Sequence, residues 1–473
     1  MKRLLCLTLA FMMALSLCAC GEAEVTPTTQ FPETNLMMGF ARANITPTTS
    51  VPLAGYGTAE NRMSTGVLDD LYVSCIAVSD GSTTALLFSQ DLLNTTAVLV
   101  PKLRSEICPK LSIPTDNLFV AATATYSGPD MKSEHESLVG YTEQYMAAFM
   151  TCAQDAVADM APTVMTCGTT EIEGLSFIHH YTMEDGTVED GYYGFFDRAI
   201  TGHAAEPDRT MRMVRASREE KPDILILNWQ CRPTLNGAKD KTQISADFVG
   251  HLRNKVEADT GMHCIYFSGS LGDISPTSRI ESEQHNLDAK AYGEKVAEYA
   301  INALDTLTPL EGNTTAGVYK GNYNCPINHE DEDKLEIAQQ VVAERKANGD
   351  LAADKLAKEL GLRSVYHAAS IIARPNRKDR DNFEVSALRL GELGFLMSPG
   401  QMSSASGVKT LSEIPTKFAI MVGQANARWY TIPSEAAFDY GGYEADTSYF
   451  ARGAGERMGE LMNEMLLMTI PTN

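Results

Sequence analysis

The chain has 473 residues, with 39 Lys and Arg against 61 Asp and Glu, so its formal net charge at pH 7 is −22. This acidic balance repels phosphate backbones and gives no indication of nucleic-acid binding. It also disfavours direct adsorption to anionic lipid, so attachment to a membrane would depend on a covalent lipid.

The N-terminal segment predicts where the protein works. Lys2 and Arg3 precede an apolar stretch over 4–17, which is too short to span a bilayer. The next residues, 17–21, read LCACG and resemble a bacterial lipobox. This predicts a signal peptide over 1–20, cleavage before Cys20 and lipid on its thiol. An ordinary secretory signal or a short membrane anchor is the alternative.

The lipobox implies an extracytoplasmic protein, lipid-anchored to the outer face of the bacterial cytoplasmic membrane. Residues 21–37 are rich in Thr, Pro and Glu and are predicted to form a flexible tether. Residues 38–473 are long for one domain but can still form a single large α/β domain. No segment of that region contains eighteen unbroken apolar residues, so we expect no spanning helix there.

Strand and helix patterns alternate along this region. Short apolar or β-branched runs predict strands at 72–78, 85–89, 118–122, 224–229, 263–267, 365–373 and 385–390. Helical spacing of apolar residues predicts helices at 142–160, 288–307, 332–348, 351–360 and 449–468. The alternation predicts an α/β fold with mixed β-sheets flanked by helices. The charged helical pair at about 332–361 is predicted to be a peripheral lid.

Four of the loops that follow apolar strands are rich in Gly, Ser, Pro or Thr. They begin after Ala122, Trp229, Phe267 and Met397. Ligand sites in open α/β sheets form beyond the carboxyl ends of strands. The sequence therefore predicts that these loops converge in one cleft.

Cysteine usage indicates buried free thiols. Outside the leader and Cys20 the number of cysteines is odd, and no C-x-x-C occurs. One disulfide remains an alternative for an exported protein. The seven residues are Cys75, Cys108, Cys152, Cys167, Cys231, Cys264 and Cys325.

Four short frames carry a family resemblance: TATYSGP at 123–129, NWQCRP at 228–233, SPGQ at 398–401 and NARWY at 426–430. They resemble the frames THTHSGP, NW…HP, PGE and N-x-Y of the neutral/alkaline (non-lysosomal) ceramidase family. Further similar stretches, in the same order as in that family, lie at 39–47, 52–57, 244–250, 272–276 and 441–444. The resemblance implies the fold of the ceramidase N-terminal domain and an amidohydrolase ancestry, with N-acylsphingosines as substrates.

In that family two His, one Glu and one Tyr hold a zinc ion, and each of these positions differs here. By the resemblance, the two His fall on Ala124 and Arg232 and the Glu on Gln401. The Tyr falls on Arg428 or, with a shifted alignment, on Tyr430 or Thr431, and the second His of THTH falls on Tyr126.

Alanine offers no donor atom, arginine stays protonated, and a neutral amide is a poor zinc ligand. We therefore predict no metal and no cofactor, and a copy that is inactive as a zinc enzyme.

The nine histidines show neither H-x-x-x-H nor H-E-x-x-H spacing. His179 and His180 are adjacent, and adjacent side chains on a strand point to opposite faces. Surface or loop roles are therefore predicted for all nine. The resemblance marks Ser275, in the GDISP loop, as an active-site residue. It could act as a nucleophile, contact a ligand or cap its own turn, although the sequence shows no His–Asp relay for it.

The predicted ligand pocket comprises Ala124, Tyr126, Ser127, Arg232, Asp273, Gln401, Arg428 and Tyr430. Within it, Arg232 is predicted either to bind an anion or to pair internally with Asp247 or Asp273. Two functions follow. The first is a non-catalytic lipoprotein that binds an amphiphile, a glycan, a peptide or another anionic ligand. The second is a hydrolase of N-acyl amides or esters that uses a metal-free or altered route.

Overall fold

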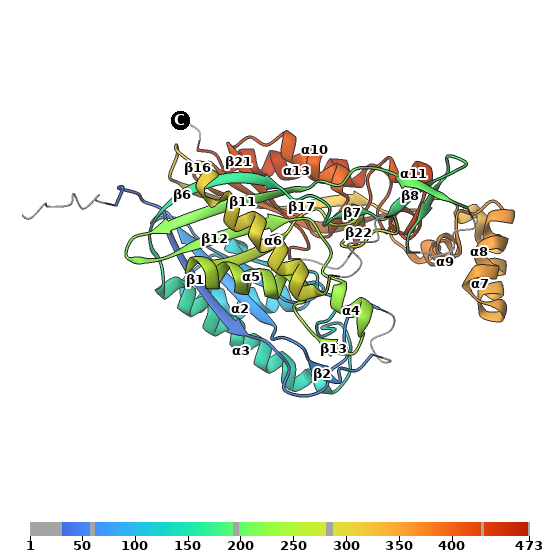
Figure 1. Ribbon diagram of the computed structural model, residues 1–473, viewed down its shortest axis with the longest axis horizontal. Helices are drawn as coiled ribbons and strands as arrows, with labels where there is room; N and C mark the ends of the chain where they lie inside the picture. The colour runs from blue at the N-terminus through green and yellow to red at the C-terminus, as the bar shows by residue number, and fades with distance from the viewer. Residues whose placement is uncertain (1–30, 57–61, 193–197, 281–286, 427–429, 472–473) are drawn as a thin grey trace, which may run out of the picture. The chain divides into compact units, whose positions relative to one another are not determined.

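The computed structural model describes residues 31–56, 62–192, 198–280, 287–426 and 430–471 (for residue 238, the backbone alone). From Thr34 onward the chain forms a compact unit. Its elements are arranged in layers, with two β-sheets in the interior and helices on their outer faces (Figure 1). This confirms the expectation of mixed β-sheets flanked by helices.

The larger sheet has nine strands. Along the sheet their order is β14-β12-β11-β6-β1-β3-β4-β5, with β16 paired to β6. The pairs β4–β5 and β12–β14 are parallel and the other pairs are antiparallel, so the sheet is mixed. The strands are β1 (Met37–Asn44), β3 (Tyr72–Ser79), β4 (Thr84–Gln90), β5 (Leu118–Ala122), β6 (Ala161–Glu171), β11 (Thr210–Arg218), β12 (Lys221–Trp229), β14 (His263–Ser268) and β16 (Thr308–Pro309).

A four-stranded sheet packs against one face of the larger sheet. Its strands, in spatial order, are β17 (Ala316–Pro326), β18 (Arg380–Leu390), β19 (Leu393–Met397) and β21 (Phe418–Val422). Buried side chains from both sheets form one hydrophobic cluster. Phe267 of β14 and Phe395 of β19 meet there edge to face, with ring centroids 6.4 Å apart.

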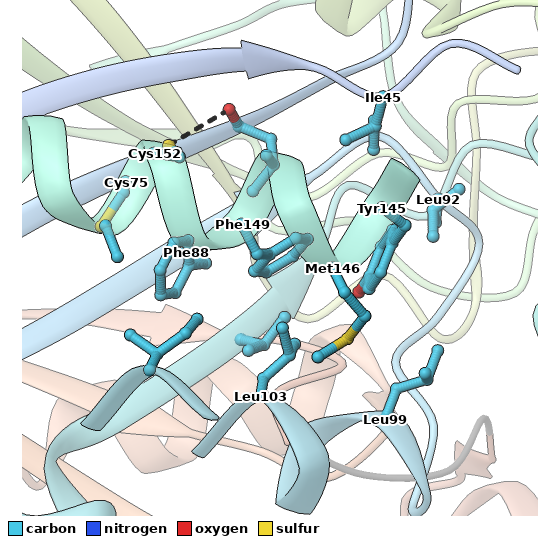
Figure 2. Close-up of a cluster of buried hydrophobic side chains, with 14 of the residues drawn as sticks. Ile45, Cys75, Phe88, Leu92, Leu99, Leu103, Tyr145, Met146, Phe149 and Cys152 are labelled. Atoms are coloured by element: carbon cyan, nitrogen blue, oxygen red, sulfur yellow. Dashed lines mark hydrogen bonds between the residues drawn. The ribbon is translucent and has the colours of Figure 1, made fainter. Parts of the chain in front are cut away.

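Helices cover the outer faces of both sheets. The larger sheet is covered by α2 (Leu99–Leu111), α3 (Ser137–Ala158), α5 (Asp247–Thr260) and α6 (Ala289–Ala303), and the smaller one by α10 (Ser404–Ser412) and α13 (Ala454–Met468). In α3 the spacing of Tyr145, Phe149 and Cys152 places all three on the buried face. Phe149 packs on Phe88 of β4 with ring centroids 4.9 Å apart (Figure 2).

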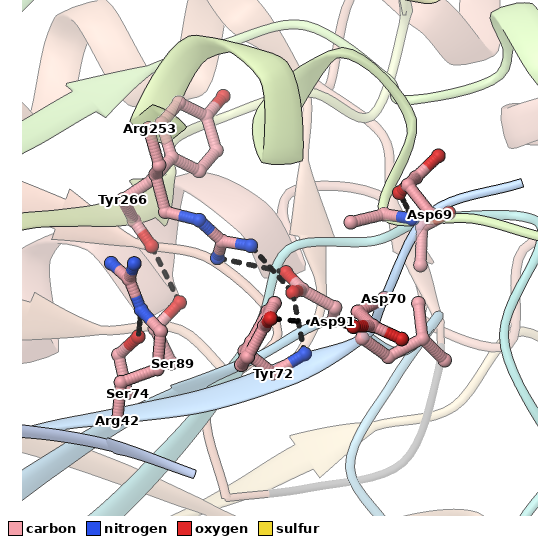
Figure 3. Close-up of polar contacts among 12 residues, drawn as sticks. Arg42, Asp69, Asp70, Tyr72, Ser74, Ser89, Asp91, Arg253 and Tyr266 are labelled. Carbon is pink, nitrogen blue, oxygen red and sulfur yellow. Dashed lines mark hydrogen bonds and ion pairs between the residues drawn. The ribbon is translucent and has the colours of Figure 1, made fainter. Parts of the chain in front are cut away.

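A buried ion pair ties α5 to the loop after β4. Arg253 donates from both terminal nitrogens to the Asp91 carboxylate, at 2.9 and 2.5 Å (Figure 3). The same carboxylate accepts from the backbone N–H of Tyr72, at 2.9 Å. The end of β4 is thereby held in place beside the loops that form the site.

Short elements surround those loops. Two-residue strands pair as β2 (Gly66–Val67) with β13 (Gln243–Ile244), β7 (Phe177–Ile178) with β15 (Ile274–Ser275), and β20 (Gln401–Met402) with β22 (Thr431–Ile432). A three-stranded sheet is formed by β8 (His180–Met183), β9 (Val188–Asp190) and β10 (Ile200–His203). The short helices are α4 (Leu235–Lys239), α11 (Ala437–Tyr440) and α12 (Tyr443–Asp446).

The predicted helical pair exists as α7 (Leu335–Asn348) and α8 (Asp350–Glu359). A third helix, α9 (Val365–Ala373), packs with them around a separate small core, beside β8 and α11 in Figure 1. The prediction of a strand over 365–373 is therefore wrong. Ser364 caps this helix by accepting from the backbone N–H of His367 at 3.0 Å, and this N-cap outweighs the β-branched residues that suggested a strand.

The seven cysteines from Cys75 to Cys325 are buried and free, as expected, so they form no disulfide within the described chain. Among the described residues, no helix has the length and apolar character needed to cross a membrane.

Candidate functional site

The structure brings together the loops that were predicted to converge. The Gly272 N–H donates to the Met402 carbonyl at 2.8 Å, and the Tyr126 N–H donates to the Pro233 carbonyl at 3.2 Å. Ser268, at the end of β14, donates from Oγ to the Thr123 carbonyl at 2.9 Å. Backbone contacts therefore fix the four loop ends relative to one another.

Three predicted pocket residues lie on the loop after β5. Ala124 is buried with a left-handed φ of 70°. Tyr126 packs its ring against Tyr56 with centroids 5.2 Å apart, and burial raises the pKa of the Tyr126 phenol. Ser127 is buried, and its hydroxyl forms no hydrogen bond with the described residues. The side chains of this loop are therefore buried and packed against their neighbours.

Gln401 and Tyr430 adjoin through their backbones but diverge in their side chains. The Gln401 N–H donates to the Tyr430 carbonyl at 2.8 Å. The Gln401 side chain is buried, and neither atom of its amide forms a hydrogen bond with the described residues. Tyr430 stacks on Tyr449 (centroids 4.9 Å apart) and lines a separate cavity of about 520 Å³ together with Met131. Arg428 lies outside the described residues.

Arg232 is buried and has an internal carboxylate partner. It donates to the Gly272 carbonyl and the Tyr192 hydroxyl, and its Nη2 lies 3.5 Å from Glu444 Oε1. The guanidinium also lies over the Tyr192 ring, 5.2 Å from its centroid. The prediction of an internal pair is correct in kind, but the carboxylate at ion-pair distance belongs to Glu444.

The two carboxylates that were predicted to pair with Arg232 are bound elsewhere. Asp247 accepts from the N–H groups of Asn236 (2.7 Å) and Phe248 (2.8 Å). Asp273 accepts from the N–H of Ser404 at 2.7 Å, and burial raises its pKa. Sequence could not identify Glu444 as the partner, because it lies 212 positions from Arg232.

Next to Arg232, four buried side chains point at one another: His179, His180, Asp190 and Glu444. His179 Nε2 lies 3.1 Å from Glu444 Oε2 and 3.9 Å from Asp190 Oδ2. His180 Nε2 lies 3.2 Å from Glu444 Oε2 and 3.3 Å from Asp190 Oδ2. We refer to these four residues as the His–carboxylate cluster.

The cluster overturns the prediction that all nine histidines occupy surface or loop positions. His179 lies in the break between β7, which ends at Ile178, and β8, which begins at His180. Strand alternation does not hold across that break, so both rings turn to the same side, with centroids 4.5 Å apart. His367, in α9, is also buried.

Neighbouring charges in the cluster shift the pKa values of His180 and Glu444 in the direction opposite to the shift that burial causes. Burial alone would lower the pKa of His180, but the carboxylates of Asp190 and Glu444 raise it to about 10. Burial would raise the pKa of Glu444, but His179 and His180 hold it well below its usual value. Each charge in the cluster thus depends on the others.

A pocket of about 300 Å³ adjoins the cluster through His179 and Tyr192, which line it. Ser275, in β15, is half-buried and also lines this pocket, as do Tyr181, Gly191, Thr277, Ser278 and Arg279. The Ser275 hydroxyl accepts from the Thr277 N–H at 3.1 Å and lies 3.3 Å from Thr277 Oγ1. Of the candidate residues, Ser275 is the one whose side chain lines this pocket.

Sequence analysis did not identify Asp190, Tyr192 or Glu444 as site residues. The one usable signal was the GGYE turn at 441–444, which was noted for its resemblance but without a role for its glutamate. Asp190 and Tyr192 had no signal: Asp190 pairs with His180 across two short strands, and Tyr192 contacts Arg232, 40 positions away.

The fold is similar to that of solved ceramidase structures. Neutral ceramidase from Pseudomonas aeruginosa superposes with a TM-score of 0.69 at 14% identity, covering 93% of this chain and 76% of that chain. A ceramidase complexed with C2 gives a TM-score of 0.68 at 14% identity, covering 93% and 77%. At this identity the similarity supports the fold. No protein-family model matches the sequence. No curated protein matches it either.

Proposed function

We propose that this chain is a surface lipoprotein whose ceramidase-like domain binds a small anionic, hydroxyl-bearing ligand in the pocket beside Ser275, without zinc catalysis at the four frames. The observation that carries this proposal is the chemistry of the pocket lining. Ser275 and Thr277 are hydroxyl-bearing lining residues, and Arg279 stands exposed among the lining residues, with its Nη2 donating to the Gly191 carbonyl at 2.8 Å. A guanidinium suits a carboxylate or a phosphate, and hydroxyls suit polyhydroxylated groups.

The size of the pocket supports a small ligand. A volume of about 300 Å³ is at the lower end of the range for small-molecule sites. Tyr181 and Tyr192 add aromatic surface, but no long apolar groove is formed by the lining residues. This favours a sugar acid or sugar phosphate over the amphiphile and peptide that the sequence left open.

The residues at the former metal frames do not fit a zinc ion. Ala124 has no donor atom, and Gln401 offers only a neutral amide. Arg232 carries a fixed positive charge and directs its N–H groups at the Gly272 carbonyl and Glu444. A cation at this position would be repelled, so we derive no catalytic step through zinc at these frames.

The contacts of Ser275 favour ligand contact over nucleophilic attack. Its hydroxyl hydrogen-bonds within its own turn, to Thr277, and no histidine–carboxylate relay contacts it in the described structure. The hydroxyl is therefore oriented but not activated.

Calorimetric titration of the full chain with glucuronate and with inorganic phosphate tests the proposal. We expect Arg279→Gln to weaken binding of both probes about tenfold, since it removes the charged partner. Ser275→Ala should weaken the binding of glucuronate more than the binding of phosphate. Arg457→Gln, on the exposed face of α13, serves as the matched control and should leave binding unchanged.

The same variants distinguish the second function, hydrolysis, from ligand binding. Turnover of N-acyl amides or esters by the parent chain, abolished in Ser275→Ala, would assign hydrolysis in place of simple binding. If the parent chain showed neither binding nor turnover, the pocket would be excluded as the functional site.

A further inference from the structure

We propose that His179, His180, Asp190 and Glu444 form a closed structural site for one divalent transition-metal ion of the zinc class. The site uses none of the frame residues, and the inference does not depend on ligand binding in the pocket. All four side chains are buried, with side-chain exposures of 4%, 1%, 0% and 3% respectively.

The spacing of the donor atoms matches a shared ion. Zinc binds nitrogen and oxygen at about 2.0–2.2 Å, so ligand atoms at the corners of a tetrahedron lie roughly 3.3–3.6 Å apart. The four nitrogen–oxygen separations in the cluster are 3.1, 3.2, 3.3 and 3.9 Å. All four donor atoms lie within 4.8 Å of one another. The 3.1 Å contact between His179 Nε2 and Glu444 Oε2 is within hydrogen-bond distance, whereas typical charge-assisted hydrogen bonds are shorter, at about 2.7–2.9 Å.

The ring nitrogen Nε2 of His180 also indicates a metal ion. This atom is near two carboxylate oxygens but forms a hydrogen bond with neither, and it has no other partner among the described residues. A buried polar nitrogen without a hydrogen bond is costly. A metal ion between the ring and the two carboxylates satisfies it, because the lone pair then points at the ion.

The carboxylates are held in place as metal ligands usually are. Asp190 accepts from the Tyr192 N–H at 2.7 Å and from the Tyr443 N–H at 2.5 Å. The remaining oxygen of Glu444, Oε1, faces Arg232 at 3.5 Å. Such outer partners orient ligating carboxylates and are part of most metal sites.

Gly442 provides the room that the site needs. Its φ is +100°, and a Cβ there would lie 2.6 Å from His180 Nε2 and 3.1 Å from Asp190 Oδ2. Any larger residue would fill the space between the two donors. The glycine turn therefore lets α12 bring Glu444 up to β8 and β9.

The donor set indicates the class of ion and its role. Two imidazole nitrogens and two carboxylate oxygens suit zinc and similar first-row dications. Four protein donors leave no open position in a tetrahedral site, which is typical of structural metals. The ion would join residues 179–190 to residue 444, which are far apart in sequence, and would neutralise two buried carboxylates.

The test uses the full chain, treated with a chelator and then freed of it. Titration with zinc should show one equivalent bound and a rise in melting temperature. Cobalt, used as a spectroscopic probe, should give the strong visible absorption of tetrahedral cobalt. No binding and no thermal shift in the parent chain would overturn the proposal.

Variants locate the site. Glu444→Gln keeps the side-chain shape and should weaken cobalt and zinc binding at least about 100-fold, as should His180→Ala. The matched control is His263→Ala, since His263 is half-buried and stacks on Phe40 at the opposite end of β14. Equal metal affinity in the parent and in folded Glu444→Gln would place the ion elsewhere and overturn the assignment. Phosphate binding, measured in parallel, tests the proposed ligand pocket independently of metal binding.

Discussion

Arg232 Nη2 lies 3.5 Å from Glu444 Oε1, and both side chains are buried. The positive charge of Arg232 therefore faces a carboxylate of the same chain. Glu444 in turn joins Arg232 to His179 and His180. Arg232 and the His–carboxylate cluster are therefore one electrostatic unit.

Arg232→Met should destabilise the metal-free protein by about 3–5 kcal/mol, because it leaves the Glu444 charge buried without this partner. Urea denaturation in the presence of a chelator measures the loss. The double variant Arg232→Met/Glu444→Gln should recover part of it, since the Glu444 charge that lost its Arg232 partner is then gone. Equal stability of the parent and Arg232→Met would show that the pair contributes nothing.

Arg253→Met should be destabilising for the same reason, by about 3–5 kcal/mol, since Asp91 is buried and both of its oxygens accept from Arg253. The control on the same helix is Lys255→Met. Lys255 forms an exposed pair with Asp259, so its loss should cost much less than the loss of Arg253. Equal losses in the two variants, measured by urea denaturation, would contradict the burial argument.

Asp247 should make stability depend on pH. Burial outweighs the backbone N–H groups that it accepts from and raises its pKa from 3.8 to about 6. The folded state therefore holds this proton more tightly than the unfolded state, and stability from this group falls as pH rises from about 4 to 6, by about 3 kcal/mol in all.

Asp247→Asn should remove this part of the pH dependence, although loss of a carboxylate acceptor lowers stability at every pH. Urea midpoints at several pH values across that window, for the parent and the variant, measure the difference in slope. Asp259→Asn, at an exposed position, should keep the parental slope. An unchanged slope in Asp247→Asn would mean that its carboxyl group titrates normally.

Local pattern predicted much of the fold. The strand at 118–122 was predicted with its exact bounds, because its five apolar residues are all buried. The helix at 365–373 was mistaken for a strand, because its β-branched composition hides the helical spacing of Val365, Ala368 and Ile371, which pack into the small core with α7 and α8. The loops around the site were correctly expected to meet, since each follows an apolar strand.

The site itself was only partly predictable. Ser275 was found through its motif and does line the pocket. The His–carboxylate cluster was missed, because an adjacent His pair has no ligand spacing, Asp190 belongs to no motif and Glu444 lies in a distant part of the chain. Only tertiary structure brings such donors together.

Cys20→Ser should release the protein from membranes. If Cys20 carries the lipid, the parent chain expressed in a bacterium should partition with membranes and incorporate labelled fatty acid, whereas Cys20→Ser should do neither.

Cys18→Ser is the matched control, because it removes a neighbouring thiol that is not the lipid acceptor and should keep both properties. Because the mature chain is strongly acidic, anionic lipid should not hold it once the acyl chains are lost. Membrane retention of Cys20→Ser together with unchanged fatty-acid labelling would refute the lipobox and favour a different N-terminal anchor.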